Sequence, residues 1–448
     1  MVKVKGFPAK WIFLFVLSVY LLTIGKGYYS TDGEVMLKLA WALAEHGKIG
    51  FPCEERLPNA PPGRNGLCYS KYGLGQSLSL LPFYLIGRNL CFLFSKGNPV
   101  IMGKWFADRA NSLFTALTAV LVGLWAFKLF SNLEVAVALS LIYSLATMAW
   151  PYAKFNFNQP LITLCLTGGF YALWNYKRKL SMALLSGVAF GWGFLTRISD
   201  IIVLPWALLL WAYLRGQNLH FWAWSTIILI AVALTVGYNL YAFGNPMGGY
   251  LGEKWSTPLF VGLYGLLMSS GKSLFLFVPI AFLFPQALTR FFKSGKRLEA
   301  VICGGLLATY LVFYASFWTW HGGWSWGPRF LVPTMPFLVL PLGALWADRK
   351  FVILLVAAIS LIIQFLGVTI NFADYMLEVN DETKILFIPQ YSPILGHFYG
   401  LLHLKWPIDL APVDLSPFGL GKGYSISLLM IYLLLLVWSS ERILKALK

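Results

Sequence analysis

The chain opens with an apolar run, residues 11–24, that leads into Tyr28-Tyr29-Ser30-Thr31-Asp32-Gly33-Glu34. We expect a first membrane span over residues 11–26, because the run is apolar and no small-residue cleavage site follows it. Asp32 and Glu34 therefore stand where the chain emerges from the membrane into water. Ionisable residues at membrane depth are candidates for function, so Asp32 is the candidate chemical centre.

The composition of the chain is that of a membrane protein. Of its 448 residues, 58% are hydrophobic and only 12% are charged, which is about half the charged fraction of soluble domains. Mean hydropathy is +0.69. Apolar runs of roughly 17–25 residues, long enough to cross a bilayer, recur along the chain, whereas a transmembrane barrel would show alternating segments of about ten residues. The sequence thus predicts an all-α, polytopic membrane protein.

The formal net charge of +17 indicates orientation rather than a nucleic-acid partner. The basic residues cluster in short gaps between apolar runs, and cytoplasmic loops of membrane proteins carry such an excess of Lys and Arg. There is no separate basic domain with interleaved aromatic residues. We therefore expect a membrane partner and no nucleic acid.

One run, residues 74–95, is long enough to span but carries Gln76, Pro82, Arg88 and Asn89. If it does not cross, the basic N-terminus and the basic loops fall on one side of the membrane; if it crosses, they fall on opposite sides. The positive-inside rule favours the first alternative, so we expect a juxtamembrane or re-entrant element on the outer face. The basic loops carry Lys128, Lys177, Arg178, Lys179, Arg215, Arg290, Lys293, Lys296, Arg297, Arg349, Lys350, Arg442, Lys445 and Lys448.

The remaining apolar runs bring the count to about twelve spans in a single domain, residues 1–448, with both termini in the cytoplasm. Two long loops then lie on the outer side of the membrane. The first covers residues 27–108 and begins with an amphipathic piece over residues 34–46; the last covers residues 371–423 and is expected to be solvated. The later spans are expected over residues 107–130, 133–151, 160–176, 180–197, 201–214, 221–243, 273–291, 299–318, 331–347, 351–371 and 424–440.

Two pieces of the first outer loop carry candidate chemistry. The acids Asp32 and Glu34 can supply a general base or bind a divalent cation, or Asp32 can instead cap a helix that begins near Glu34. Lys71 and Tyr72 precede Gly73, and glycines let a backbone approach a phosphate closely. The alternative is a Lys and Tyr pair that anchors the chain at the membrane interface.

Cations on the outer ends of later spans are further candidates. Arg197 lies between two apolar runs and can bind a phosphate or pair with Asp200. Lys272 ends a glycine-rich stretch, residues 244–272, whose length suggests a lid. Lys272 can alternatively anchor the next span.

Residues 317–330 combine four tryptophans with His321 and Arg329, interrupted by glycines. Tryptophan is typical of membrane interfaces, so an aromatic belt is one interpretation. Non-helical backbone at that depth usually lines a cavity, which is the functional interpretation. Arg329 would then offer a two-pronged fork to a phosphate.

Cys53 and Cys68 bracket a proline-rich part of the first outer loop. On the outer side of a membrane they can form a disulfide, or they can remain two free thiols. The chain has no Cys-x-x-Cys pair of the kind that holds zinc.

At this point the sequence resembles the GT-C superfamily of membrane glycosyltransferases, within it most closely the group of protein O-mannosyltransferases and lipid A aminoarabinose transferases. The likeness covers residues 1 to about 350. One departure is the glycine between the two acids, which are adjacent in protein O-mannosyltransferases. The resembling pieces are Tyr29-Ser30-Thr31-Asp32-Gly33-Glu34, Lys71-Tyr72-Gly73-Leu74-Gly75-Gln76-Ser77, Leu195-Thr196-Arg197 and Trp326-Gly327-Pro328-Arg329-Phe330.

The resemblance implies a polyprenyl-phosphate-linked sugar as donor and transfer to an extracytoplasmic acceptor (lipid, glycan or protein) with inversion at the sugar. Asp32 would act as the general base and Glu34 would orient it. We expect no metal and no other cofactor. A lipid-carrier flippase or transporter, and a polysaccharide polymerase or ligase, are the alternatives. The residues expected to bind the donor phosphate are Lys71, Tyr72, Arg197, Lys272, His321 and Arg329.

Overall fold

The computed structural model describes the chain except residues 1–5, 26–28, 55–56, 58, 95–96 and 411–421. Its regular structure is helical, and within the described residues the only strand-like pairing is formed by isolated bridges between Phe51 or Pro62 and Cys68. The basic residues Lys3 and Lys5, the first residue of the motif at 28–34 and part of the last outer loop fall outside the described residues.

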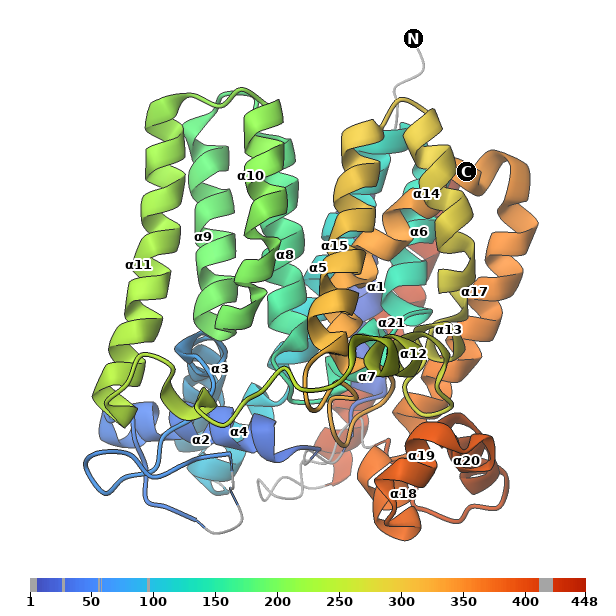
Figure 1. The fold of residues 1–448 in the computed structure, drawn as a ribbon. Coiled ribbons are helices and arrows are strands. Elements are labelled where there is room, and N and C mark those ends of the chain that lie inside the picture. The colour runs from blue at the N-terminus through green and yellow to red at the C-terminus, as the bar shows by residue number, and fades with distance from the viewer. Residues whose placement is uncertain (1–5, 26–28, 55–56, 58, 95–96, 411–421) are drawn as a thin grey trace.

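Long helices stand side by side as a bundle, which makes the protein a multi-pass membrane protein (Figure 1). Five helical stretches of the described chain are long and apolar enough to cross a membrane by length and composition: Pro99–Phe130, Asn218–Phe243, Arg297–Ala315, Arg329–Thr369 and Ser425–Leu447. Each predicted span overlaps at least one helix, and the span predicted over residues 273–291 is divided into two short elements followed by α14. The overlapping elements are α1 (Ala9–Leu22), α5 (Ala110–Phe130), α6 (Leu133–Leu145), α8 (Gln159–Trp174), α9 (Leu180–Thr196), α10 (Leu204–Tyr213), α11 (Asn218–Phe243), α14 (Phe284–Lys293), α15 (Arg297–Ala315), α17 (Trp346–Thr369), α21 (Lys422–Leu447) and the segmented rod described below.

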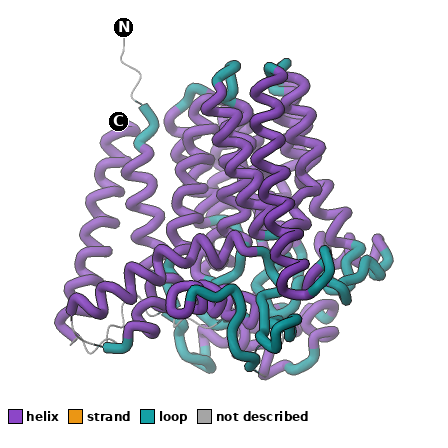
Figure 2. Tube along the Cα trace, turned by 90° about the vertical axis from the view of Figure 1, so that its left-hand side faces the viewer, coloured by secondary structure: helices purple, strands orange, loops and turns teal. Residues whose placement is uncertain are grey.

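The start of α1 and the end of α21 lie at the same end of the bundle (Figures 1 and 2). Trp11 of α1 packs edge-on against Trp438 of α21 with ring centroids 4.6 Å apart. The loops at this end of the bundle (Figure 1) are the basic ones, and polar contacts join several of them: Lys128 donates to Asn175 at 2.6 Å, and other contacts pair Lys350 with Glu134 and Arg290 with Asp348. The structure thus groups the basic loops as the sequence predicts.

The first outer loop folds as three helices at the opposite end of the bundle (Figure 1): α2 (Thr31–His46), α3 (Leu74–Phe94) and α4 (Pro99–Ala107). Helix α3 contains Pro82 and packs against α2 and α4. It lies with them at the end of the bundle instead of running alongside the spans. The described part of the run, residues 74–94, therefore does not stand among the spans, as the charge pattern predicts.

One predicted span is a stack of short pieces: η4 (Arg329–Thr334), α16 (Met335–Val339) and η5 (Leu340–Leu345). It contains Pro333, Pro336 and Pro341, and proline lacks the N–H that continues an α-helix. Short 3₁₀ segments accommodate the prolines, and irregular backbone is tolerated at membrane depth because this rod is buried in protein. Arg329 is the first residue of this rod, so its backbone position is fixed by the core.

The last outer loop differs from the expected solvated loop. Much of it folds into α18 (Phe372–Val379), α19 (Glu382–Phe387), η6 (Pro389–Tyr391) and α20 (Pro393–Leu402). His397 of α20 is fully buried, and its ring lies 4.7 Å from that of Trp326. Burial lowers the pKa of His397 to about 4. These helices therefore pack directly on residues 317–330, which we call the tryptophan-rich segment.

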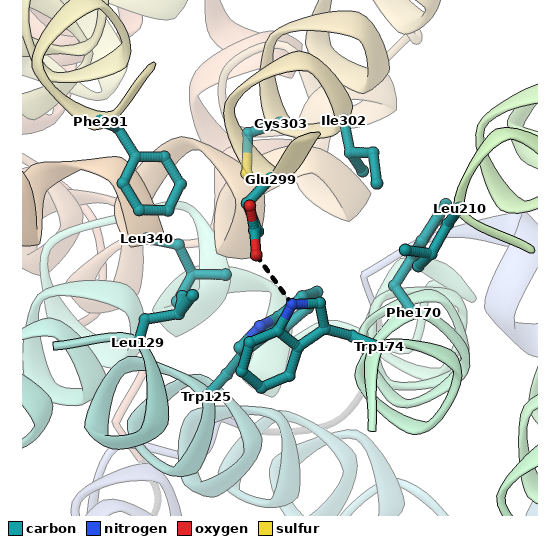
Figure 3. Close-up of a pocket in the computed structure, with 10 residues that line it drawn as sticks. All are labelled: Trp125, Leu129, Phe170, Trp174, Leu210, Phe291, Glu299, Ile302, Cys303 and Leu340. Atoms are coloured by element: carbon teal, nitrogen blue, oxygen red, sulfur yellow. Dashed lines mark hydrogen bonds between the residues drawn. The ribbon is translucent and has the colours of Figure 1, made fainter. Parts of the chain in front are cut away.

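Short elements complete the chain: α7 (Ala149–Lys154), η1 (Ile198–Val203), η2 (Gly248–Tyr250), α12 (Leu259–Met268), α13 (Leu274–Phe277) and η3 (Pro279–Leu283). The core between α5, α8, α14 and α15 encloses a small cavity of about 10 Å³ (Figure 3). There Trp174 Nε1 donates to Glu299 at 2.9 Å, which satisfies a carboxylate in the first turn of α15. This cavity is far too small for an organic ligand.

Candidate active site

The N-terminus of α2 presents Asp32 to the rest of the molecule. Ser30 is the capping residue, because its side chain accepts from the Gly33 N–H at 3.1 Å. The alternative prediction, that Asp32 caps this helix, is therefore wrong. A Cβ atom at Gly33 would lie 2.2 Å from the side chain of Asn156, so only glycine lets the helix start approach this closely. Asp32 is left free to point into the site from the first turn.

The Asp32 carboxylate has two partners from distant parts of the chain. Its Oδ2 atom lies 3.0 Å from Arg329 Nη1, and its Oδ1 atom accepts from Asn59 Nδ2 at 2.6 Å. Asn59 also donates to Thr31 Oγ1 at 2.9 Å. The Asp32 and Arg329 side chains are 15% and 16% exposed, so the pair is accessible but shielded. The first outer loop and the tryptophan-rich segment thus meet at one carboxylate.

Aromatic rings hold the Arg329 guanidinium in place. Its central carbon lies 4.7 Å from the ring centre of Phe157 and 5.2 Å from that of Phe330. The Arg329 Nε atom is buried and has no hydrogen-bond partner within the described part of the chain. Buried N–H groups are normally satisfied, so this donor is available for a further acceptor.

Lys71 and Tyr72 lie next to this pair. Burial, followed by the nearby Asp32 charge, raises the pKa of Tyr72 well above its usual value. Lys71 Nζ lies 3.4 Å from Glu253 Oε1, and Glu253 Oε2 accepts from Trp318 Nε1 at 2.6 Å. Glu253 therefore fastens the predicted lid, residues 244–272, to both the first outer loop and the tryptophan-rich segment.

Lys272 is buried behind the tryptophan-rich segment. Its Nζ donates to Gly323 O at 2.9 Å, Ser325 Oγ at 3.0 Å and Ser325 O at 2.5 Å. Burial, together with the Arg329 charge, lowers the pKa of Lys272 well below its usual value. These contacts brace the loop that leads to Arg329.

His321 connects the same segment to the last outer loop. Its Nδ1 atom lies 3.0 Å from Glu382 Oε1. The His321 contact lowers the pKa of Glu382. A helix from the last outer loop therefore supports the site from outside.

Two predicted site residues have partners elsewhere. Glu34 pairs with Lys104 at 3.1 Å, so Asp32 and Glu34 serve different partners although only Gly33 separates them. Arg197 donates to both carboxylate oxygens of Asp200, at 2.6 and 2.7 Å, which is the alternative named from the sequence.

Arg197 nevertheless keeps one donor. Its Nη1 atom is buried without a hydrogen-bond partner in the described residues. Its guanidinium lies 5.6 Å from the ring centre of Tyr314. The Tyr314 ring stacks on that of Phe330, with ring centres 4.3 Å apart, and Phe330 follows Arg329 in the sequence. Arg197 therefore contacts Arg329 only indirectly, through these two rings.

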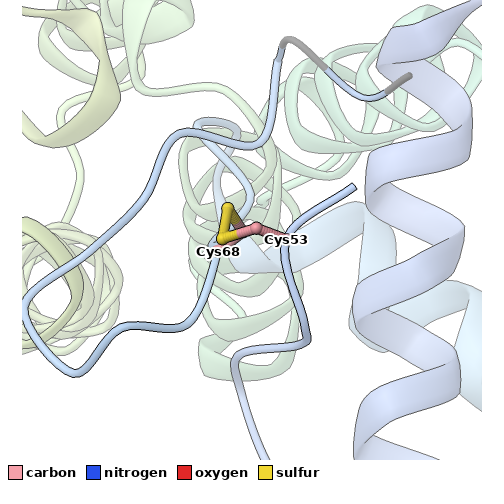
Figure 4. The surroundings of a disulfide bond; sticks show 2 residues. All are labelled: Cys53 and Cys68. Atoms are coloured by element: carbon pink, nitrogen blue, oxygen red, sulfur yellow. A yellow bond between two sulfur atoms is a disulfide. The ribbon is translucent and has the colours of Figure 1, made fainter. Parts of the chain in front are cut away.

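A disulfide joins Cys53 to Cys68 (Figure 4), which decides between the two alternatives left by the sequence. Asn59, the second partner of Asp32, lies inside the loop that this bond closes. Sequence reasoning missed Asn59, since its only signal was a position among prolines. It also missed the support from α19 and α20, because the acids of the last outer loop, such as Asp381 and Glu382, indicated a solvated loop.

A metal site does not emerge from the described residues, where no three His, Cys, Asp or Glu side chains gather closely enough to hold an ion. Metal independence therefore remains a prediction.

Comparisons with known proteins bear on the fold. No protein-family model and no curated protein matches the chain. Crystal structures of ArnT from Cupriavidus metallidurans do match: the apo state with a TM-score of 0.51 and 16% identity over 90% of this chain and 75% of that chain, and the complex with undecaprenyl phosphate with a TM-score of 0.50 and 15% identity over 88% and 75%. The protein therefore shares the fold of ArnT, which agrees with the all-α, polytopic fold class expected from its sequence.

Proposed function

We propose that the protein is a membrane glycosyltransferase that moves a sugar from a polyprenyl-phosphate donor to an acceptor hydroxyl outside the cytoplasmic membrane. The observation that carries the proposal is the pairing of Asp32 with Arg329 at the end of the bundle away from the termini. A base and a phosphate-binding cation are the two groups that such a transfer needs. The ArnT complex with undecaprenyl phosphate supports the choice of donor.

The reaction is an inverting single displacement. The acceptor oxygen attacks the anomeric carbon and gives its proton to Asp32, while the bond from that carbon to the phosphate oxygen breaks. Negative charge grows on the departing polyprenyl phosphate. Fixed cations stabilise that charge because they need no reorganisation as it develops.

Arg329 and Lys71 are the cations best placed to hold the donor phosphate. Arg329 reaches Asp32 through Nη1 only, and its buried Nε remains available. Lys71 is held by Glu253, a contact that the donor phosphate must displace. The Tyr72 ring centre lies 5.5 Å from Lys71 Nζ, and the charges of Asp32 and Arg329 both act on its hydroxyl. Lys272, His321 and Arg197 act from behind, by holding the backbone and aromatic rings around Arg329.

Placement outside the cytoplasm rests on two features. A disulfide such as Cys53–Cys68 persists in oxidising compartments, and it lies in the same outer loop as Asp32. The basic loops lie at the other end, where the positive-inside rule places the cytoplasm. Both termini would then be cytoplasmic.

The test is to incubate membranes containing the protein with separate radiolabelled polyprenyl-phosphate hexoses and pentoses. We expect label from one donor class to leave the polyprenol fraction and appear on an acceptor. Glu134→Gln, which alters an exposed pair at the other end of the bundle, is the matched control and should transfer normally. Donor that binds or crosses the membrane without losing its sugar would instead identify a lipid-carrier transporter.

A further inference from the structure

A groove that the proposed chemistry does not use lies at the end of the bundle that carries the termini. Its volume is about 490 Å³, within the roughly 300–1,000 Å³ typical of ligand sites. It is open on one side, unlike the small enclosed cavity of Figure 3. Residues of α10, α14 and α15 line it: Trp206, Leu288, Thr289, Phe292, Lys293, Ala300, Val301, Gly304, Gly305 and Ala308.

The floor of the groove is α15 and its walls are larger side chains. Trp206 approaches α15 so closely that a Cβ atom at Gly305 would lie 2.2 Å from the indole ring. The indole is fixed there because its Nε1 donates to Thr309 at 2.9 Å. On the other side Phe292 is 43% exposed, and Val301 is 41% exposed. The groove is therefore a preformed, mostly apolar channel that opens to the outside of the protein.

The depth of the groove matches one leaflet of a bilayer. It follows α15 from Ala300 to Ala308, which at 1.5 Å per residue is a rise of about 12 Å. The hydrocarbon core of a bilayer is about 30 Å thick, so the groove ends before the midplane. An acyl chain that lies in the groove would therefore belong to a lipid of the leaflet next to the basic loops.

The positive charge of Lys293, at the end of the groove nearest the basic loops, indicates that the lipid headgroup is anionic. Lys293 is the charged residue of the lining, and no carboxylate of the described chain pairs with it. Its basic neighbours in sequence are engaged: Arg290 pairs with Asp348, while Lys296 lies 5.5 Å from the ring of Phe130 and Arg297 lies 5.6 Å from that of Phe292. A phosphate at the mouth would meet a surface of positive charge.

We propose that this groove binds an anionic phospholipid of the inner leaflet, with one acyl chain along α15 and the headgroup phosphate on Lys293. Basic pockets between membrane helices on the cytoplasmic side select anionic headgroups in this way. The site is separate from the Asp32 site, so the proposal stands whether or not the transferase assignment is correct.

The test uses the full-length protein in phosphatidylcholine vesicles that contain a trace of phosphatidylglycerol with a photoactivatable acyl chain. After irradiation, labelled peptides are identified by mass spectrometry. We expect labelling of the peptide that carries residues 288–308. The same acyl chain on phosphatidylcholine should label it about fivefold less, because one lysine near the surface is worth about that factor for an anionic lipid.

Two variants test the acyl-chain contact and the headgroup contact separately. Ala308→Phe fills the groove and should remove the labelling, whereas Leu229→Phe on the lipid-facing side of α11 should not. Lys293→Gln should lower labelling by phosphatidylglycerol to the phosphatidylcholine level, whereas Lys177→Gln at the same end should not. Unchanged labelling of α11 in Ala308→Phe and Lys293→Gln shows that the fold is intact.

Three results would overturn the proposal: labelling that survives Ala308→Phe, equal labelling by the two headgroups in the unaltered protein, or disulfide crosslinks between two copies of a Val301→Cys variant. The last result would show that the groove is a surface between copies.

Discussion

Arg329 Nη1 lies 3.0 Å from Asp32 Oδ2, although 297 positions separate the two residues in the chain. This contact joins the first turn of α2 to the first residue of the segmented rod. It also places a candidate base and a candidate phosphate-binding cation in one partly shielded site. The proposed function depends on this pairing.

Arg329→Lys should lower kcat/KM for the donor by about 100-fold, the usual effect of removing one fixed donor that stabilises developing charge. Lysine keeps the charge but lacks the planar guanidinium, which lies against Phe157 and can bind Asp32 through one nitrogen and a phosphate through another. Steady-state kinetics with the donor identified above give this number. Arg290→Lys at the other end of the bundle is the control, and equal losses in both variants would contradict a specific role.

Glu253→Gln should lower the KM for the donor by about two- to fivefold, the range expected for a partly exposed ion pair. Glutamine can still accept from Trp318 Nε1, but it no longer competes with phosphate for Lys71. Glu378→Gln, which alters an exposed pair with Lys405 in the last loop, is the control. A higher KM in Glu253→Gln would show that Glu253 holds Lys71 in its working position.

Gly33→Ala should reduce transfer by about 100-fold, because a small displacement of a reacting group can cost that much. The new Cβ atom would lie 2.4 Å from the backbone oxygen of Asn156, so the start of α2 and Asp32 must shift. Gly237→Ala is the matched control, since its Cβ atom would meet nothing within 4 Å. Normal transfer by Gly33→Ala would show that the close approach of Gly33 to Asn156 is not needed to position Asp32.

The stability of the protein should fall between about pH 6.5 and pH 4 through His397. Its folded-state pKa of about 4 lies below that of an unfolded histidine, so the unfolded state binds the proton first and the folded state is disfavoured as pH falls. The shift corresponds to at most about 3 kcal/mol. His397→Phe keeps a ring against Trp326 and should flatten the pH dependence of thermal unfolding in detergent. If His397→Phe leaves the pH dependence unchanged, groups other than His397 cause the loss of stability.

The sequence predicts the spans well because hydropathy and loop charge both report on the membrane. It also predicts that Asp32 and Arg329 share one end of the bundle, since that conclusion needs only the order of the spans. The position of α3 follows from the same reasoning. None of these predictions needs to know which side chains touch.

Partner choice was harder to predict because it depends on local geometry. Asp32 and Glu34 are two positions apart on a helix, and such residues point in nearly opposite directions. This relation becomes clear only once Ser30, not Asp32, is known to cap α2. The folded part of the last outer loop escaped prediction because its helices are short and because acids such as Asp381 and Glu382 indicate a solvated loop. Burial such as that of His397 depends on tertiary packing that the sequence pattern does not report.

The most direct test of the central claim is Asp32→Asn, assayed for both donor binding and sugar transfer with the same radiolabelled donor. Asparagine keeps the shape of the side chain but cannot take the acceptor proton, and loss of a general base typically costs 10²–10⁴-fold. We predict a loss of transfer of at least about 100-fold with donor binding retained, while Asp348→Asn at the other end of the bundle behaves normally. Full transfer by Asp32→Asn would contradict the account.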